Sequence, residues 1–207
     1  MLPTSHWRQL LVSCLFVVTL SACPSEVRYI LVIGDSLTAG AGIDADDAYP
    51  ALLETKLRQD LGNFRVINAG ANGAMTSAGP ELLQSHIAEH TPEMTVVALG
   101  ANDVLRGVKP EVAKKNLEQI IKMSLDQNMK VVLVGLQTTN GYNSAYHKRF
   151  AKIYVDLAAK YSLALVPSLL EGIVGHKDLN LADGKHPNEK GHEIMADHVF
   201  EVVAPNL

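Results

Sequence analysis

A serine near the start of the chain is the first residue that could do chemistry. Ser36 follows a short apolar run, residues 30–33, which ends at Gly34 and is typical of a buried strand. A hydroxyl at the carboxyl end of such a strand lies where open α/β sheets bind their ligands, so Ser36 is a candidate nucleophile. By position alone, a serine that caps a helix or belongs to a turn is the more ordinary interpretation. The choice depends on whether the chain supplies partners for Ser36.

Toward the C-terminus, a carboxylate and an imidazole lie in one predicted turn, Asp183-Gly184-Lys185-His186-Pro187. With this spacing, Asp183 can reach Nδ1 of His186 and leave Nε2 facing outward. Pro187 favours an extended backbone at His186, which projects the imidazole away from the following helix. These two residues can therefore activate a serine hydroxyl. The alternative is a capping aspartate beside a surface histidine.

Two further segments offer hydrogen-bond donors for a developing oxyanion. Gly73 ends the segment 68–73 and can present a backbone N–H without a side chain in the way. Asn102 follows another predicted strand, and its amide NH₂ can donate two hydrogen bonds. Together with the N–H of Ser36, these groups would form an oxyanion hole with three donors. Gly70 is a second candidate for the glycine, and Asn102 could instead cap a helical turn.

Strand and helix patterns alternate along the rest of the chain. Strands are predicted over 28–33, 64–68, 94–99, 131–136 and 163–166, and helices over 49–61, 80–90, 110–125, 145–161 and 188–203. This alternation predicts an α/β fold with three layers, α/β/α, around a parallel sheet of five strands. The small strand count favours the flavodoxin-like order 2-1-3-4-5. For the helix from Pro110 we expect a buried stripe of Val112, Leu117, Ile120, Ile121 and Leu125.

Composition excludes several other classes of protein. The chain has 207 residues, of which 47% are hydrophobic and 19% charged, and this is enough for one domain with a substantial core. A net charge of −4 gives no basic face for nucleic acid. The first turn lacks G-x-G-x-x-G and a Walker-type lysine, which argues against nucleotide binding. A metal site at Asp183, His186 and His192 is disfavoured, because His192 falls inside the last predicted helix, where it packs or hydrogen-bonds.

The first residues are predicted to be a signal peptide, residues 1–22, that is removed. The apolar run 10–20 is too short to span a bilayer, and Leu20-Ser21-Ala22-Cys23 is similar to a bacterial lipobox. We therefore expect Cys23 to be the lipidated mature N-terminus, residues 23–27 a short tether, and 28–207 the folded domain. Ser25 follows, with no Asp that would signal retention in the inner membrane, so the expected location is the outer membrane, facing the periplasm. An ordinary cleavage site and a soluble periplasmic protein are the alternatives.

The motifs together resemble those of a known enzyme superfamily. Gly34-Asp35-Ser36-Leu37, Gly73, Gly100-Ala101-Asn102-Asp103 and Asp183-x-x-His186 match the four blocks of the GDSL, or SGNH, hydrolases over essentially the whole mature chain. The segments 48–53 and 99–107 are most similar to the bacterial branch of acyl-CoA thioesterase I, lysophospholipase L1 and arylesterase. The resemblance implies Ser36 as nucleophile, Asp183 and His186 as the other triad members, and Gly73 and Asn102 as oxyanion donors. It also implies the flavodoxin-like fold, with no metal or organic cofactor.

One segment departs from that branch. Where the branch usually has Gly-Asp-Thr or Gly-Glu-Thr, this chain has Gly73-Ala74-Met75-Thr76. The change removes a carboxylate and reshapes the adjoining pocket wall.

The function expected from these residues is hydrolysis of carboxylic esters or thioesters of acyl substrates by a serine esterase. We expect Met75, Leu105, Val108 and Tyr142 to line an apolar groove for the acyl chain. A carbohydrate O-acetyl esterase is one alternative, and a non-catalytic lipoprotein that binds lipid or glycan is another. The sequence carries no signal for an oligomeric state.

Overall fold

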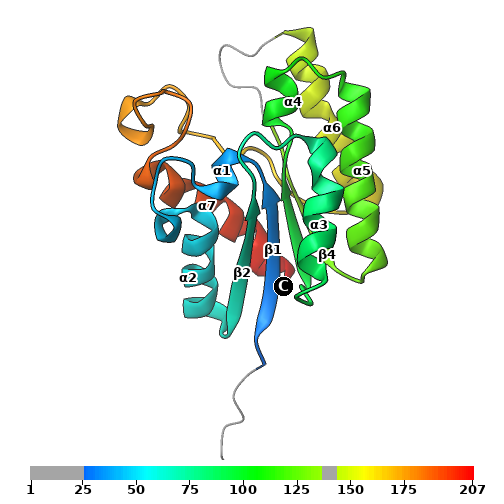
Figure 1. Ribbon diagram of the computed structural model, residues 1–207, viewed down its shortest axis with the longest axis vertical. Coiled ribbons are helices and arrows are strands. Elements are labelled where there is room, and N and C mark those ends of the chain that lie inside the picture. The colour runs from blue at the N-terminus through cyan, green and yellow to red at the C-terminus, as the bar shows by residue number, and fades with distance from the viewer. Residues whose placement is uncertain (1–25, 137–143) are drawn as a thin grey trace, which may run out of the picture.

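A parallel sheet of five strands forms the centre of the computed structural model, which describes residues 26–136 and 144–207 (Figure 1). The strands are β1 (Arg28–Gly34), β2 (Phe64–Gly70), β3 (Met94–Ala98), β4 (Lys130–Val134) and β5 (Ala164–Val166). All neighbours are parallel, and their order is 2-1-3-4-5. The predicted fold class and strand order are therefore confirmed. Cys23 and Tyr142 lie outside the described residues.

Helices cover both faces of the sheet. On one face lie α2 (Tyr49–Leu61) and α7 (Glu189–Val203), and on the other α3 (Gly79–Ile87), α5 (Pro110–Asp126) and α6 (Ala145–Tyr161) (Figure 1). Side chains alternate along a strand, so Ile30 and Val32 pack with α2 and α7, whereas Leu31 and Ile33 pack on the opposite face. Both faces of β1 are consequently buried, which explains its unbroken apolar sequence.

The remaining elements are short. Two helices, α1 (Ser36–Ala39) and α4 (Ala101–Leu105), lie at the carboxyl end of the sheet, and neither was predicted as a separate element. The 3₁₀ turns are η1 (Ala45–Asp47), η2 (Thr76–Ala78), η3 (Lys177–Leu179) and η4 (Ala204–Asn206). Within the described ranges, no helix has the length and apolar character needed to cross a bilayer.

The buried stripe predicted for α5 was wrong at two of its positions. Val112 is 48% exposed and Leu125 is 38% exposed, whereas Ala113 and Ser124 are fully buried. Successive helical residues point about 100° apart, so Val112 and Leu125 each lie beside the stripe instead of in it. The small side chains of Ala113 and Ser124 occupy the face that packs inward, and a prediction based on large apolar residues passes over them.

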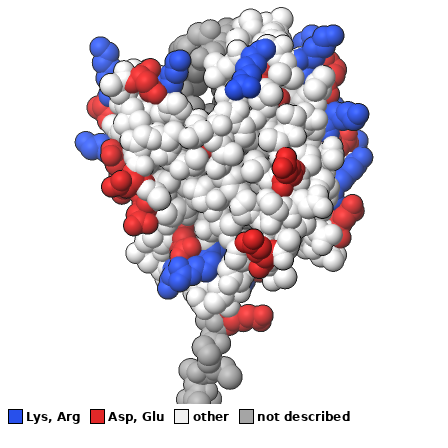
Figure 2. Space-filling view, in the orientation of Figure 1, with Lys and Arg blue, Asp and Glu red and all other residues white. Residues whose placement is uncertain are grey.

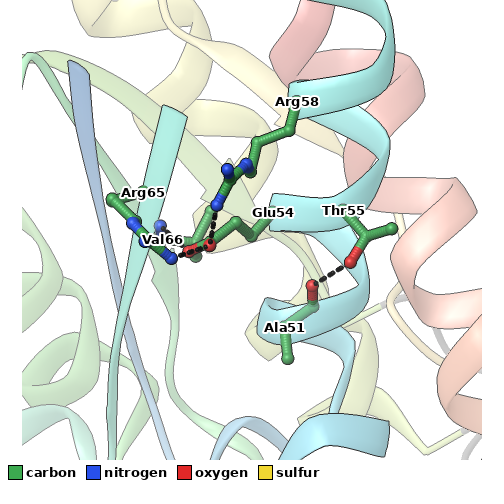
Figure 3. A network of polar contacts seen from close by, with 6 residues as sticks. All are labelled: Ala51, Glu54, Thr55, Arg58, Arg65 and Val66. Carbon is green, nitrogen blue, oxygen red and sulfur yellow. Dashed lines mark hydrogen bonds and ion pairs between the residues drawn. The ribbon is translucent and has the colours of Figure 1, made fainter. Parts of the chain in front are cut away.

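The edge strand β2 is tied to helix α2 by one glutamate (Figure 3). Glu54 Oε2 accepts a hydrogen bond from the backbone N–H of Val66 at 2.9 Å, and Oε1 pairs with Arg65 at 2.6 Å and with Arg58 at 3.4 Å. An edge strand leaves its outward N–H groups without a partner strand. Glu54 satisfies one of them and thereby joins helix, strand and two cations in one network.

Two glycines allow helix α1 to lie close against the strand ends. Gly34 and Gly70 are paired in the register of β1 and β2. A Cβ on Gly34 would lie 1.8 Å from Thr38 Oγ1, and one on Gly70 would lie 2.3 Å from the backbone nitrogen of Ala39. Any side chain at either position would therefore push α1 away from the sheet. This close approach fixes the place of Ser36, the first residue of α1.

Candidate active site

Ser36 is held at the carboxyl end of β1 by the cap of its own helix. The Asp35 side chain accepts a hydrogen bond from the Leu37 N–H at 3.0 Å, which caps the N-terminus of α1. The strand end and the cap together fix the backbone at Ser36, whose side chain lines a pocket. This end of β1 lies beside the switch point between β1 and β3, where ligands bind in open α/β sheets.

The structure brings Asp183, His186 and Ser36 into one hydrogen-bonded chain. His186 Nδ1 lies 2.6 Å from Asp183 Oδ2, and His186 Nε2 lies 3.0 Å from Ser36 Oγ. The turn that carries the first two residues is closed by a bond from Leu181 N–H to the His186 carbonyl at 2.8 Å. Residues 150 positions apart in sequence thus meet at hydrogen-bond distance. This is the geometry in which a histidine can take a proton from a serine hydroxyl.

Hydrogen bonds keep the Asp183 carboxylate ionised. The bond from the His186 side chain, then the backbone N–H groups of His186 and Lys185, hold the pKa of Asp183 well below its usual range. An ionised Asp183 can only accept a hydrogen bond, so Nδ1 of His186 carries the proton and donates a hydrogen bond to Asp183 Oδ2. Nε2 is then left without a proton and can accept the hydrogen of Ser36 Oγ. The imidazole is therefore oriented and polarised for general-base chemistry.

Two backbone N–H groups at the pocket have no protein acceptor. Within residues 26–136 and 144–207, neither Ser36 N–H nor Gly73 N–H donates a hydrogen bond to another group. Gly73 lines the pocket beside Ser36. Gly70, the other glycine considered, instead donates its N–H to Asn68 Oδ1 at 2.9 Å and packs against α1. Of the two glycines, Gly73 is therefore the one that lines the pocket with a backbone N–H that has no acceptor in the described residues.

Asn102 also lines the pocket, but its side-chain NH₂ group already donates two hydrogen bonds. Nδ2 of Asn102 donates to Asp35 Oδ2 and to the Ala74 carbonyl, each at 3.1 Å. An NH₂ group has two hydrogens, so an oxyanion must share one or take one over. Burial raises the pKa of Asp35, which is 2% exposed, while the Leu37 N–H and Asn102 lower it in part. The contact between Asp35 and Asn102 was not predicted, although a carboxylate directly after a buried strand was a signal for it.

A second buried aspartate supports the loop that carries Gly73. Asp103 is 1% exposed and accepts bonds from Thr76 N–H at 2.8 Å and from Thr76 Oγ1 at 2.6 Å. These bonds tie the 73–76 segment to helix α4. Asp103 therefore supports the turn beside the pocket.

A pocket of about 670 Å³ opens in front of Ser36 and His186. Its walls come mainly from apolar side chains, which include Leu37, Val104, Leu105, Leu136, Phe150 and Leu169. Of the residues expected to line an acyl groove, Leu105 lies on this wall and is 70% exposed. Met75 and Val108 are not on it. The Sδ atom of Met75 contacts Arg106 Nη1 at 3.8 Å, and the Val108 carbonyl accepts a bond from Tyr146 at 2.8 Å.

Behind the site lies a buried chain of polar groups that the sequence did not reveal. Thr38 Oγ1 and the Tyr49 hydroxyl are 2.8 Å apart, and Tyr49 N–H donates to His192 Nδ1 at 3.1 Å. Burial lowers the pKa of His192 to about 4. The hydrogen bond to Tyr49 N–H confirms the prediction that His192 packs or hydrogen-bonds inside the last helix. Across the described ranges, no three His, Cys, Asp or Glu side chains lie together as metal ligands would.

The parallel sheet with an Asp–His–Ser chain at its carboxyl end is typical of serine hydrolases, and comparison with known families identifies the same class of enzyme. The profile of the GDSL-like Lipase/Acylhydrolase family matches residues 32–194. The chain belongs to this family and is a carboxylic ester hydrolase.

Its relatives include named esterases and thioesterases. Esterase TesA of Pseudomonas aeruginosa is 33% identical over 96% of this chain and 98% of its own. Thioesterase 1/protease 1/lysophospholipase L1 of Escherichia coli K12 is 30% identical over 92% of this chain and 90% of its own. The crystal structure of TesA superposes with a TM-score of 0.82 over 87% of this chain and all of that one, at 33% identity. AlinE4, an SGNH-hydrolase family esterase, superposes with a TM-score of 0.72 at 38% identity, over 88% of this chain and 97% of its own.

Proposed function

We propose that the chain hydrolyses carboxylic esters or thioesters of acyl substrates with Ser36 as nucleophile, His186 as general base and Asp183 as the residue that orients His186. One observation carries the proposal. Asp183 Oδ2, His186 Nδ1, His186 Nε2 and Ser36 Oγ form a continuous chain of contacts, 2.6 Å and 3.0 Å long, at an apolar pocket. An aspartate, a histidine and a serine linked in this order form an arrangement that recurs on unrelated folds, in which the histidine activates the serine hydroxyl.

The reaction begins when Ser36 Oγ attacks the acyl carbonyl and His186 Nε2 takes the hydroxyl proton. Asp183 holds the imidazole in place and stabilises the imidazolium that forms. His186 then gives the proton to the departing alcohol or thiol, which leaves an acyl group on Ser36. Water attacks this acyl group in the second half of the reaction, again with His186 as base.

Negative charge on the carbonyl oxygen is stabilised most by hydrogen-bond donors that need little reorganisation. The N–H groups of Ser36 and Gly73 are suited to this role because neither has another acceptor in the described parts of the chain. Asn102 is the proposed third donor. Its Nδ2 would shift from the Ala74 carbonyl, 3.1 Å away, toward the oxyanion while its bond to Asp35 keeps it in position.

The apolar pocket favours substrates with an acyl chain longer than acetyl. Phe150, Leu136 and Leu169 offer contact area to a hydrocarbon chain, and about 670 Å³ would be left mostly unfilled by an acetyl group. The names of the relatives, which include esterase, arylesterase and thioesterase/lysophospholipase, agree with such substrates. A carbohydrate O-acetyl esterase fits this pocket less well. A non-catalytic binding protein would have no need of the Ser36–His186 contact.

Hydrolysis of p-nitrophenyl butyrate tests the assignment. We expect Ser36→Ala to abolish turnover and Asn102→Ala to lower it by about 10²- to 10³-fold, since loss of one oxyanion donor costs about 2.7–4 kcal/mol. Ser85→Ala, which changes an exposed serine on α3, is the matched control and keeps the parent rate. Undiminished turnover by Ser36→Ala would contradict the assignment of the nucleophile.

We further propose that lipid on Cys23 anchors the enzyme to the outer membrane, facing the periplasm. Glu26, the first described residue, comes just before β1, and Ser36 comes just after it, so the two lie at opposite ends of this strand and an anchor near Glu26 would leave the pocket unobstructed. Labelling of cells with radioactive palmitate is the test. We expect label on the parent protein and none on Cys23→Ala, and an unlabelled parent protein would refute the anchor.

A further inference from the structure

One exposed charge lies on the wall of an otherwise apolar pocket. Among the described residues that line the pocket, the ionisable ones apart from histidine are Asp35 and Lys185. Asp35 is buried and accepts bonds from Leu37 N–H and Asn102. Lys185 is exposed, and within the described ranges it forms no ion pair. Its ammonium group is therefore available to a ligand.

The backbone around Lys185 is fixed next to the reacting atoms. Lys185 N–H donates to Asp183 Oδ1 at 2.9 Å, and its neighbour in sequence, His186, contacts Ser36 at 3.0 Å. Adjacent Cα atoms are about 3.8 Å apart, and a lysine side chain is long enough to bring its ammonium alongside a substrate that touches His186. The nearest carboxylate in sequence, Asp183, is occupied by the N–H groups of His186 and Lys185 and by His186 Nδ1.

Acyl transfer determines which part of a substrate meets Lys185. The carbonyl oxygen must point toward Gly73 and Ser36 N–H, and the acyl chain must lie against the apolar wall. The departing atom receives its proton from His186 Nε2, so the leaving group lies on the His186 side. Lys185 directly precedes His186 and lines the pocket with it, which puts Lys185 next to the leaving group. The other cation near the site, Arg106, has Nη2 3.5 Å from where a Cβ of Gly73 would lie, which is the oxyanion side.

We propose that Lys185 is a specificity-determining residue that favours esters and thioesters whose leaving group carries a carboxylate or a phosphate. The inference rests on the proposed function, because it assumes that His186 protonates the leaving group. Figure 2 shows Lys and Arg side chains interspersed with Asp and Glu side chains at the end of the molecule where the strands reach their carboxyl ends, so the inference rests on Lys185 itself and not on a wider basic patch.

Matched substrate pairs with the same acyl group test the inference. One pair is 4-nitrophenyl butyrate and 3-carboxy-4-nitrophenyl butyrate, and the other is butyryl-N-acetylcysteamine and butyryl-CoA, so carboxylate and phosphate are tested separately. The readout is the ratio of kcat/KM for the anionic substrate to that for the neutral one, in which any general effect on the triad cancels. We expect this ratio to fall about 1.5- to 5-fold in Lys185→Met, as for an exposed ion pair, and further in Lys185→Glu.

Two controls accompany the variants. Lys122→Met changes the net charge equally on α5, away from the pocket, and keeps the parent ratio. In the parent enzyme, raising the ionic strength lowers the ratio toward that of Lys185→Met, and this measurement needs no variant to fold. Ratios that neither Lys185 variant nor salt changes would overturn the inference while hydrolysis itself continues. Failure of the parent enzyme to hydrolyse any of the four substrates would overturn the proposed function, and the inference with it.

Discussion

His192 gives the folded state a pH dependence that can be calculated from its surroundings. The side chain is 1% exposed, its Nδ1 accepts a bond from Tyr49 N–H, and its ring stacks on that of Tyr49. Its pKa is lowered from 6.5 to about 4, mainly by burial; the charge of Glu189 opposes this shift and that of His186 adds to it. The folded protein therefore holds His192 neutral at pH values where an unfolded chain protonates it.

The sign of the effect follows from proton binding. Between pH 6.5 and about 4 the unfolded state binds more protons at this position, so the free energy of unfolding falls as the pH falls. The contribution of His192 is complete above pH 6.5 and is lost as the pH approaches 4. The shift corresponds to about 3 kcal/mol in total, and about 2 kcal/mol of this is already lost at about pH 5.

Urea unfolding at several pH values, followed by far-UV circular dichroism, measures this contribution. His192→Asn keeps an acceptor for Tyr49 N–H but cannot be protonated. We expect the stability of the parent protein to fall by about 2 kcal/mol more than that of His192→Asn between about pH 8 and 5. Equal pH dependence in the two proteins would refute the calculation, whatever the absolute stability of the variant.

Two further predictions concern stability. Glu54→Ala leaves Val66 N–H without its acceptor and removes the partner of Arg65, and we expect the free energy of unfolding to fall by about 1–3 kcal/mol; an unchanged urea midpoint would contradict the network of Figure 3. Gly100→Ala places a Cβ 2.0 Å from the Tyr154 hydroxyl at a residue whose φ is 128°, and we expect a loss of at least about 2 kcal/mol; a variant with the parent melting temperature would show that the contact yields without cost.

The regular elements were predictable because their patterns repeat over many residues. The bounds predicted for α2 and α6, 49–61 and 145–161, agree with the structure, and each strand was found within a few residues. Apolar runs and helical spacing suffice for this. By contrast, α1 and α4 contain only four and five residues, and no periodicity can appear over so short a length. The position of α1 also depends on the close approach of Thr38 to Gly34 and on the cap provided by Asp35, and neither contact is visible in a sequence pattern.

The site was predictable in its residue types and much less so in its interactions. Each of Ser36, Gly73, Asn102, Asp183 and His186 was singled out because a chemically competent residue followed a strand or opened a helix, and these residues lie together in the structure. The buried connections from Thr38 to Tyr49 and on to His192 join residues that are distant in sequence and have no shared motif. The walls of the pocket were harder still to predict, because Met75 and Val108 are near the site in sequence but do not line the pocket.

The activation of Ser36 by His186 is tested most directly by the rate at which a fluorophosphonate probe labels the protein. Peptide mass spectrometry identifies the labelled residue, and His176→Ala, which changes an exposed histidine outside the pocket, is the matched control. We expect the label on Ser36, labelling of His176→Ala at the parent rate, and labelling of His186→Ala that is slower by at least about 10³-fold. Label on another residue, or equally fast labelling of Ser36 without His186, would contradict the account.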